Sequence, residues 1–524
     1  MLDLVIKNGT IVDGTGSQGV LTDLAVKNGE IVELGKLRSY EARVTINAQG
    51  LYVCPGFIDI QNHSDSYWTL FDYPKQDSMI AQGITTITVG QCGASLAPLP
   101  SIDAIKSVQK WHSLSGVNIN WQHFEELLVQ IERQELGVNV ASLVGHSTLR
   151  RGLIGDTVRA LTSQEVKMLE KLTTQSLRSG AWGMSMGLAY AHEYNSSISE
   201  LDSAATLLKE RDRLLSVHLR SEGAHILDAL DEVLHLAEAT RVRMKISHFK
   251  LQGANNWPLF PELLSRLEQA YQKGLAVSFD VYPYTTSWTV LYTYLPKWAY
   301  EGGREQLIKR LSEPYHRNRI LQALLESRKD LSSVKIATTT EAPHLIGRTL
   351  LDIAADQGVS PEEAILNILL STESEVVVFD NNTSEEHLHA LLTHPLSMIA
   401  SNGAGFPANI SQHTRNLVHP RCFGSTAQFL SLARNKKILT LEQAIHKVTG
   451  RPAEILGLAD RGLLKSRMKA DLVIFDYESL RDLATFENPY QSPLGIRWVI
   501  IGGKLALAEG ELTGGAFGRV LRAE

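Results

Sequence analysis

The stretch GFIDIQNHSDSYW, residues 56–68, follows a Pro-Gly break and starts the pattern that decides the fold. Its first half is apolar and its second half is polar, which is typical of a buried parallel strand that ends at a functional edge. Eight runs of this kind occur along the chain: GFIDIQNHSD (56–65), ITTITVGQCG (84–93), VNVASLVGHS (138–147), AWGMSMG (181–187), LLSVHLRSE (214–222), RMKISHFK (243–250), LAVSFDVYPY (275–284) and PLSMIASNG (395–403). Longer helical patterns separate them, so the sequence predicts an α/β protein built on a (β/α)8 TIM-like barrel.

The two ends of the chain differ from this middle. Residues 1–54 and 461–524 consist of short alternating strands separated by Gly and Asn turns, and we expect them to form one small β-sandwich. The predicted barrel domain spans 55–460. Within it, residues 285–350 carry an aromatic cluster and a Gly-Gly pair that break the rhythm. We interpret this segment as an insertion over the barrel mouth; a packed aromatic subdomain without substrate contact is the alternative.

The composition restricts the partners. A formal net charge of -6 and the absence of long basic runs argue against nucleic acid and favour a small-molecule substrate. No apolar window approaches the roughly 20 residues that a membrane span needs, and no secretory signal opens the chain. Three scattered cysteines fit a reducing compartment, so a cytoplasmic location is expected. The sequence does not indicate an oligomeric state.

Four potential metal ligands follow the predicted strands. They are His63, Cys92, His218 and His248. A thiolate and imidazoles suit zinc, and a catalytic zinc ion typically keeps three protein ligands and water. A lone barrel cysteine or histidine is more often a packed or hydrogen-bonded residue, but three of them at strand ends of one predicted barrel favour a metal site.

The sequence resembles the N-acyl-D-amino-acid deacylases (D-aminoacylases) of the amidohydrolase superfamily. The resemblance runs nearly end to end and rests on ordered motifs: PGFID (55–59), GHSTLR (145–150), GAWGMSMGLAY (180–190), HLRSE (218–222), SHFKLQG (247–253), DVYPYT (280–285), HPR (419–421), ADLVIFD (470–476) and the closing block from ENPYQSPLG onward.

The resemblance implies a set of site residues. Cys92, His218 and His248 match the tight zinc site, and Gln61 and His63 match an H-x-H pair that reaches a weaker second metal. Asn402 falls where the family carries the aspartate that acts as general base. Substrate carboxylate and carbonyl groups are expected at Lys250, Tyr282 and Arg421. Arg421 offers a bidentate fork to a carboxylate, although an ion pair with a protein acid is the alternative.

Two departures from the family pattern, Gln61 and Asn402, affect positions that take part in metal binding and catalysis in the family. Asn402 can orient water but cannot take up its proton, and loss of a general base typically costs about 10² to 10⁴ in rate. The amide of Gln61 is a poor zinc ligand, and AWGMSMG offers no lysine for a two-metal bridge, so one firmly bound Zn²⁺ is predicted. Asp65 shares a side of its strand with His63 and could bind metal or act as base; orientation of a ligand is the role we favour.

The sequence therefore predicts a zinc-dependent amidohydrolase that cleaves N-acyl (D-)amino acids or related small amides with metal-activated water. The alternative is a catalytically impaired or inactive relative that keeps the fold and serves in binding or regulation.

Overall fold

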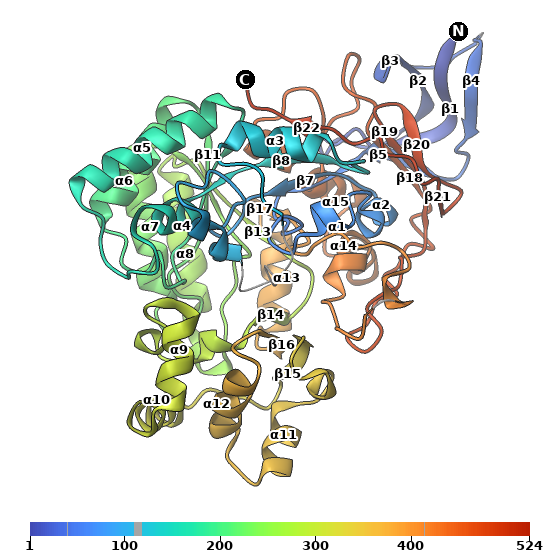
Figure 1. Cartoon of the computed structure of the whole chain (residues 1–524). Helices are drawn as coiled ribbons and strands as arrows, with labels where there is room; N and C mark the ends of the chain where they lie inside the picture. Colours follow the sequence, from blue (N-terminus) through green and yellow to red (C-terminus); the bar gives the residue numbers. More distant parts are fainter. Residues whose placement is uncertain (39, 109–117, 413) are drawn as a thin grey trace.

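Each of the eight predicted runs contains strand in the computed structural model, which describes residues 1–524 except 39, 109–117 and 413 (Figure 1). The strands are β6 (Phe57–Asp59), β7 (Ile84–Val89), β8 (Asn139–Ser142) with β9 (Val144–Gly145), β10 (Gly183–Gly187), β11 (Leu214–His218), β12 (Arg243–Ile246), β13 (Val277–Val281) and β17 (Ser397–Ile399). All ladders between these strands are parallel, in the orders β6-β7-β8 and β9-β10-β11-β12-β13-β17.

The two parallel sheets meet at both of their ends. Leu143 alone separates β8 from β9. Beyond the ends of β6 and β17, the amide of Asn402 donates to the carbonyl of Gln61 at 2.9 Å, and the amide of His63 donates to the carbonyl of Gly403 at 2.7 Å. The carboxyl ends of the first and last strands of the set therefore lie side by side.

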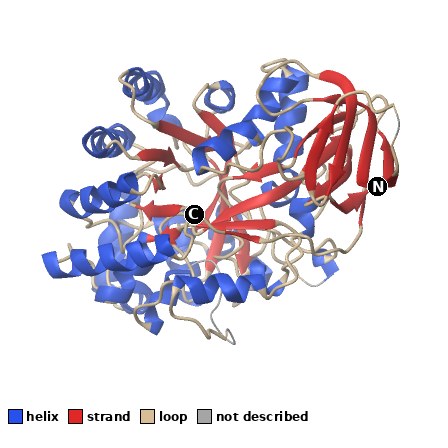
Figure 2. Ribbon diagram, turned by 90° about the horizontal axis from the view of Figure 1, so that it is seen from above, coloured by secondary structure: helices blue, strands red, loops and turns tan. Residues whose placement is uncertain are grey.

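Helices follow the strands and cover their outer side, as the view from above shows (Figure 2). They are α1 (Thr69–Asp72), α2 (Asp77–Ala81), α3 (Phe124–Glu132), α4 (His146–Ile154), α5 (Ser163–Arg178), α6 (Ile198–Glu210), α7 (Ile226–Thr240), α8 (Phe260–Gln272), α13 (Glu385–Thr393), α14 (Arg421–Lys436), α15 (Leu441–Val448) and α16 (Gly450–Leu456). Several have the start signals expected from sequence; in α5, Thr162 and Glu165 form a reciprocal capping box. The apolar stripes of these helices and the strands share one large buried cluster.

Both ends of the chain contribute to one further sheet. Its strands are β1 (Leu2–Ile11), β2 (Val20–Lys27), β3 (Glu30–Leu34), β4 (Ala42–Asn47), β5 (Tyr52–Pro55), β18 (Leu472–Phe475), β19 (Ile496–Ile501), β20 (Lys504–Ala508) and β21 (Glu511–Leu512). The two ends join where β18 pairs antiparallel with β5. One stretch departs from the expected division, because β22 (Val520–Leu521) pairs with β8 instead of the terminal sheet.

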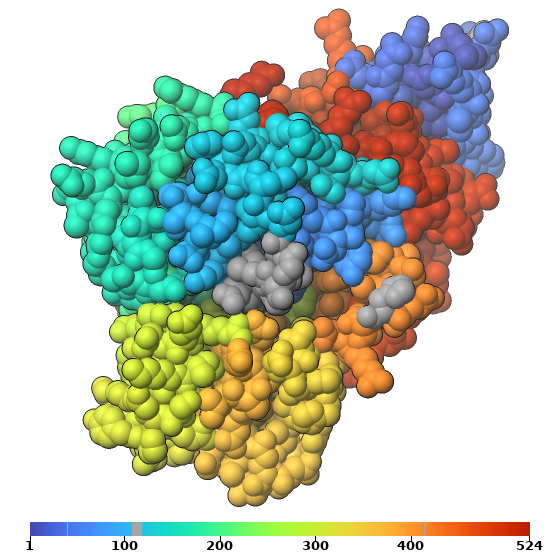
Figure 3. Space-filling model, in the orientation of Figure 1, coloured from blue at the N-terminus to red at the C-terminus, as the bar shows by residue number. Residues whose placement is uncertain are grey.

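The insertion is longer than the sequence indicated. Its three-stranded antiparallel sheet joins β14 (Thr286–Val290) to β16 (Val376–Asn381) and β16 to β15 (Lys335–Thr339), so it reaches Asn381 rather than ending near 350. Its helices are α9 (Gly303–Ser312), α10 (Pro314–Ser327), α11 (Leu350–Gln357) and α12 (Pro361–Ser371). These elements have an apolar core of their own and form a lobe beside the main body (Figure 3). The helical pattern after residue 350 resembles that of a βα unit, which is why the sequence placed the boundary too early.

Among the described residues, no helix combines the length and the apolar character needed to cross a membrane.

Candidate metal centre and active site

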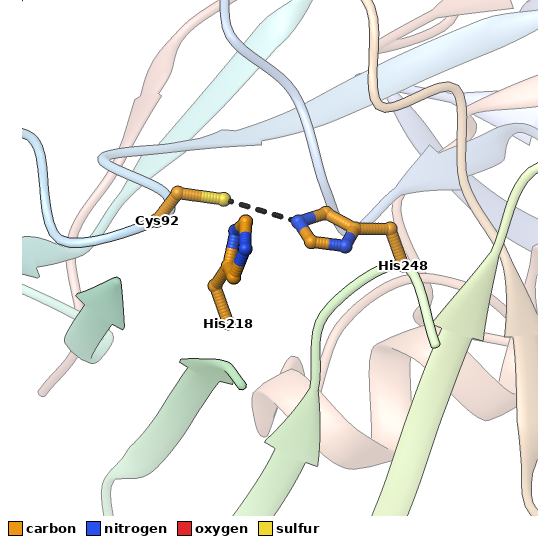
Figure 4. Close-up of side chains that lie close together, drawn as sticks. All are labelled: Cys92, His218 and His248. Atoms are coloured by element: carbon orange, nitrogen blue, oxygen red, sulfur yellow. Dashed lines mark hydrogen bonds between the residues drawn. The ribbon is translucent and has the colours of Figure 1, made fainter. Parts of the chain in front are cut away.

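Three strand ends bring a thiol and two imidazoles together. Cys92 follows β7, His218 is the last residue of β11, and His248 follows β12. One potential ligand atom from each lies within 4.8 Å of the other two (Figure 4). The Sγ atom of Cys92 is 3.4 Å from Nε2 of His248, and the two imidazole rings meet edge to face with their centroids 4.4 Å apart. These three side chains can therefore reach a single ion.

The backbone at this site is unusual. Cys92 has a φ of 53° and His248 a φ of 37°, in the left-handed region that residues with a side chain seldom adopt. Asn402 also lies there, with a φ of 48°, which asparagine tolerates better. Such conformations cost of order 1–3 kcal/mol each and cluster at functional sites. The fold thus holds two potential ligands in strained positions.

Glu222 orients the imidazole of His248. Its Oε1 atom lies 2.8 Å from Nδ1 of His248 and also accepts from Nζ of Lys250 at 2.6 Å. With the proton on Nδ1, the lone pair of Nε2 faces Cys92. Burial, reinforced by Lys250, keeps the pKa of His248 well below its usual value, so the ring is neutral. This carboxylate-imidazole arrangement is typical of metal-binding histidines, and the buried thiol and imidazole donors fit zinc. Glu222 is the last residue of the HLRSE motif, and its role was not predicted from the sequence.

The predicted second-metal side is built differently. Nε2 of His63 lies 2.9 Å from Oδ1 of Asn402, and because that oxygen only accepts, the imidazole is the donor. Gln61 is fully buried and donates from Nε2 to the sulfur of Cys92 at 3.2 Å. Its carbonyl oxygen consequently points away from the three potential ligands.

Asp65 lies outside this cluster. Its Oδ2 atom accepts from the backbone amide of Gly90 at 2.8 Å, at the end of β7. Burial raises the pKa of its carboxyl to about 7. The side chain thus supports the loop that carries Cys92 and does not line the cavity described below.

The three predicted substrate residues lie together, because the Nζ atom of Lys250 and the guanidinium of Arg421 both lie near the ring of Tyr282. Arg421 is 3% exposed, and its guanidinium lies 4.6 Å from the ring of Tyr282 and 5.6 Å from that of Trp288. No carboxylate within the described residues forms an ion pair with Arg421, and its Nε atom has no hydrogen-bond partner there. Lys250, by contrast, is paired with Glu222; burial lowers its pKa, but this carboxylate gives a net rise.

One cavity of about 50 Å³ joins these groups. It is lined by the three potential ligands together with His63, Asn402, Glu222, Lys250, Tyr282 and Arg421. A cleft of about 1360 Å³ between α7 and the insertion adjoins this cavity, since Tyr190, His218 and Glu222 line both.

Comparison with known proteins identifies the family. The model of the amidohydrolase family matches residues 44–506. The chain belongs to the amidohydrolase family. A D-aminoacylase from Alcaligenes xylosoxydans xylosoxydans is 31% identical to it over 99% of this chain and 97% of its own length. The resemblance noted from the motifs is therefore confirmed.

Solved structures of amidohydrolases agree with this assignment. An N-acyl-D-glutamate deacylase from Bordetella bronchiseptica, complexed with zinc and a phosphonate mimic of the tetrahedral intermediate, has 30% identity and a TM-score of 0.84 over both full chains. A D-aminoacylase with a binuclear metal centre, described by one-metal activation and second-metal attenuation, has the same identity, coverage and TM-score. These relatives are metal-containing hydrolases of carbon-nitrogen bonds other than peptide bonds.

Proposed function

We propose that this chain is a zinc-dependent amidohydrolase that cleaves the amide bond of N-acyl (D-)amino acids or related small amides. One observation carries the proposal: a single buried cavity joins a thiol and two imidazoles to a guanidinium without a carboxylate partner among the described residues. The first group suits a metal ion, and the second suits the carboxylate of an amino acid.

Cys92, His218 and His248 are the proposed zinc ligands. A zinc ion held there would act as a Lewis acid on the amide carbonyl and lower the pKa of water. Glu222 would keep His248 in the tautomer that presents Nε2. We propose one ion, since the carbonyl of Gln61 faces away from the other ligands. The D-aminoacylase above is described by one-metal activation and second-metal attenuation, which supports a one-metal site in this chain.

Arg421 is the proposed anchor for the substrate carboxylate. Its fork matches two carboxylate oxygens, and the neighbouring ring of Tyr282 restricts the guanidinium to one side. Lys250 lies 5.9 Å from the same ring, so it could contact a substrate oxygen while remaining paired with Glu222. This arrangement would direct the scissile amide toward the zinc ligands.

Asn402 and His63 are the proposed water-orienting groups. Because Oδ1 of Asn402 accepts from His63, its NH2 group remains to donate to substrate or water. The family is expected to carry a carboxylate base at this place. The amide of Asn402 is not a carboxylate, and His63 already donates from Nε2 to Asn402.

The architecture proposed with this function is the closed (β/α)8 barrel of the sequence prediction. The order of the parallel strands and the hydrogen bonds between residues 61–63 and 402–403 support closure. The metal, the substrate and Asn402 would then share the carboxyl-end mouth. We retain the cytoplasmic location as part of this proposal.

A second candidate function is favoured by Asn402 itself. An amide at the general-base position fits a catalytically impaired protein that binds an N-acyl amino acid without rapid turnover. The same cavity would serve either role, so only turnover separates them.

The test begins with the purified protein and its metal content. Amine release from matched N-acetyl-D- and N-acetyl-L-amino acids is then measured before and after chelation and after zinc is restored. We expect about one zinc per chain, and turnover that chelation removes and zinc restores. Cys92→Ala serves as the variant without metal.

The outcomes separate the alternatives. Zinc binding and substrate binding without turnover, with turnover appearing in Asn402→Asp, would support the impaired relative. A chain that holds no zinc, or a Cys92→Ala variant with normal zinc content, would refute the proposed site.

A further inference from the structure

A buried lysine lies beneath the proposed metal centre, at a position where the strand pattern suggests an apolar residue. Lys245, in β12, is fully buried between Met244 and Ile246. Its Nζ atom lies 2.6 Å from Oδ2 of Asp280 and 2.5 Å from Oε1 of Gln61. A more distant contact, 3.4 Å to the carbonyl of Ile60, accounts for its third hydrogen. This ammonium group is therefore surrounded by acceptors.

Lys245 determines which way the amide of Gln61 faces. An ammonium group only donates, so it selects the carbonyl oxygen of Gln61, and Ser247 donates to the same oxygen at 3.2 Å. The amide nitrogen is thereby directed at the sulfur of Cys92, 3.2 Å away. A flipped amide would place two donors face to face and an oxygen against the sulfur. The orientation of Gln61 thus follows from the chemistry of its neighbours.

Asp280 connects the same lysine to a second proposed ligand. Its Oδ1 atom accepts from the backbone amide of His248 at 2.8 Å, while Oδ2 accepts from Lys245. His248 has a positive φ, so this bond helps to hold a strained backbone position. One buried ion pair therefore acts on both Cys92 and His248.

We infer that Lys245 is a positioning residue that restricts the metal centre to a single ion. Through Gln61 it supplies an N–H···S hydrogen bond to the thiolate of Cys92. Its positive charge, in contact with the side chain at position 61, opposes a second cation at the place where an H-x-H pair would bind one. This inference rests on the proposed metal site. It attributes the binding of a single ion to Lys245, and not only to the presence of Gln61 where the family carries a histidine.

Metal counting tests the inference without any substrate. Three proteins are saturated with zinc, desalted and analysed for zinc per chain: the wild type, the double variant Gln61→His/Asn402→Asp, and the same double variant with Lys245→Met and Asp280→Asn added. The last two changes remove both charges together, so that no unpaired charge is left buried. We expect one zinc in the wild type, one in the double variant and two in the quadruple variant.

A spectroscopic measurement covers the case in which the quadruple variant does not fold. In the cobalt-substituted protein, Gln61→Leu removes the N–H···S bond, which raises the energy of the thiolate donor orbital. The thiolate-to-cobalt charge-transfer band should therefore move to longer wavelength. Gln91→Leu is the matched control, because Gln91 is equally buried and donates to the carbonyl of Ile60 rather than to Cys92.

Each result has a definite meaning. Two zinc ions in the double variant, a folded quadruple variant with only one, or an unmoved band in Gln61→Leu would overturn the role of Lys245. A wild type without any metal would instead refute the proposed function, so the two failures are distinguishable.

Discussion

Replacing Arg421 separates a substrate anchor from a structural arginine. The guanidinium is 3% exposed and has two aromatic neighbours but no carboxylate partner within the described residues. If a substrate carboxylate completes the site, Arg421→Lys keeps the charge and loses one of two charge-assisted hydrogen bonds. Such a bond contributes about 1.5–3 kcal/mol, so kcat/KM should fall about 10- to 150-fold. Arg421→Met, which loses both bonds, should lower it by about 10² to 10⁴.

Replacing Arg421 should not lower the stability of the protein, whereas replacing an ion-paired arginine should. Arg421→Met loses cation–π contacts of about 1–2 kcal/mol in total, but it also removes a charge that is buried without a counter-ion. We therefore expect an unchanged or higher urea midpoint. Arg461 is the matched control, since it is 8% exposed and lies 2.6 Å from Oδ2 of Asp471. Arg461→Met should cost about 3–5 kcal/mol, because it leaves a buried carboxylate unpaired.

The assays are amine release from an N-acyl-D-amino acid over a range of substrate concentrations and urea unfolding without substrate. An Arg421→Met variant as destabilised as Arg461→Met, with kcat/KM unchanged, would refute the anchor. It would instead indicate that Arg421 has a structural role.

Three further outcomes are expected. Glu222→Gln should weaken zinc affinity about 10- to 100-fold in a competition titration with a chelating dye, because His248 loses its orienting carboxylate; an unchanged affinity would argue against that role. Asn402→Asp should raise kcat by about 10² to 10⁴ if the missing base limits turnover, and an equal or lower kcat would show that the reaction proceeds without a base there. Burial, with a contribution from Arg451, lowers the pKa of Lys447 to about 7, so the unfolded chain binds more protons between about pH 7 and 10.5. Stability from this group should rise across that window by at most about 1.4 kcal/mol per pH unit, and urea unfolding of Lys447→Met should lack this rise.

The strands were predictable because burial and function affect the same short segments. A parallel strand covered on both faces must be apolar, and its carboxyl end meets the neighbouring ends. The runs that contain Cys92, His218 and His248 therefore indicated both the strands and the proximity of the three side chains. The structure brings these potential ligands within 4.8 Å of one another.

Other features had no local signal. The partner of β14 lies about ninety residues later in the chain, in β16, and antiparallel pairing at that separation leaves no periodicity to detect. Lys245 lies between the apolar residues Met244 and Ile246 of β12. Its position in the strand pattern does not distinguish it from an ordinary buried residue. Its role depends on Asp280, which lies in β13, and on Gln61, which follows β6. Contacts of this kind follow from the packing of the whole sheet and not from any one segment.

The placement of the two departures bears on whether the protein is active. Gln61 donates to Cys92 and Asn402 contacts His63, at the positions where the sequence predicted the second metal, while the three potential ligands and Glu222 lie together. The retained features carry energetic costs: two left-handed backbone conformations and one buried guanidinium without a partner among the described residues. A metal ion and a substrate carboxylate would offset these costs, whereas a protein that bound neither would gain stability from losing them. Because Gln61 also forms an ordered network with Lys245 and Cys92, we interpret the altered positions as a site adapted to one ion rather than as the remains of a two-metal site.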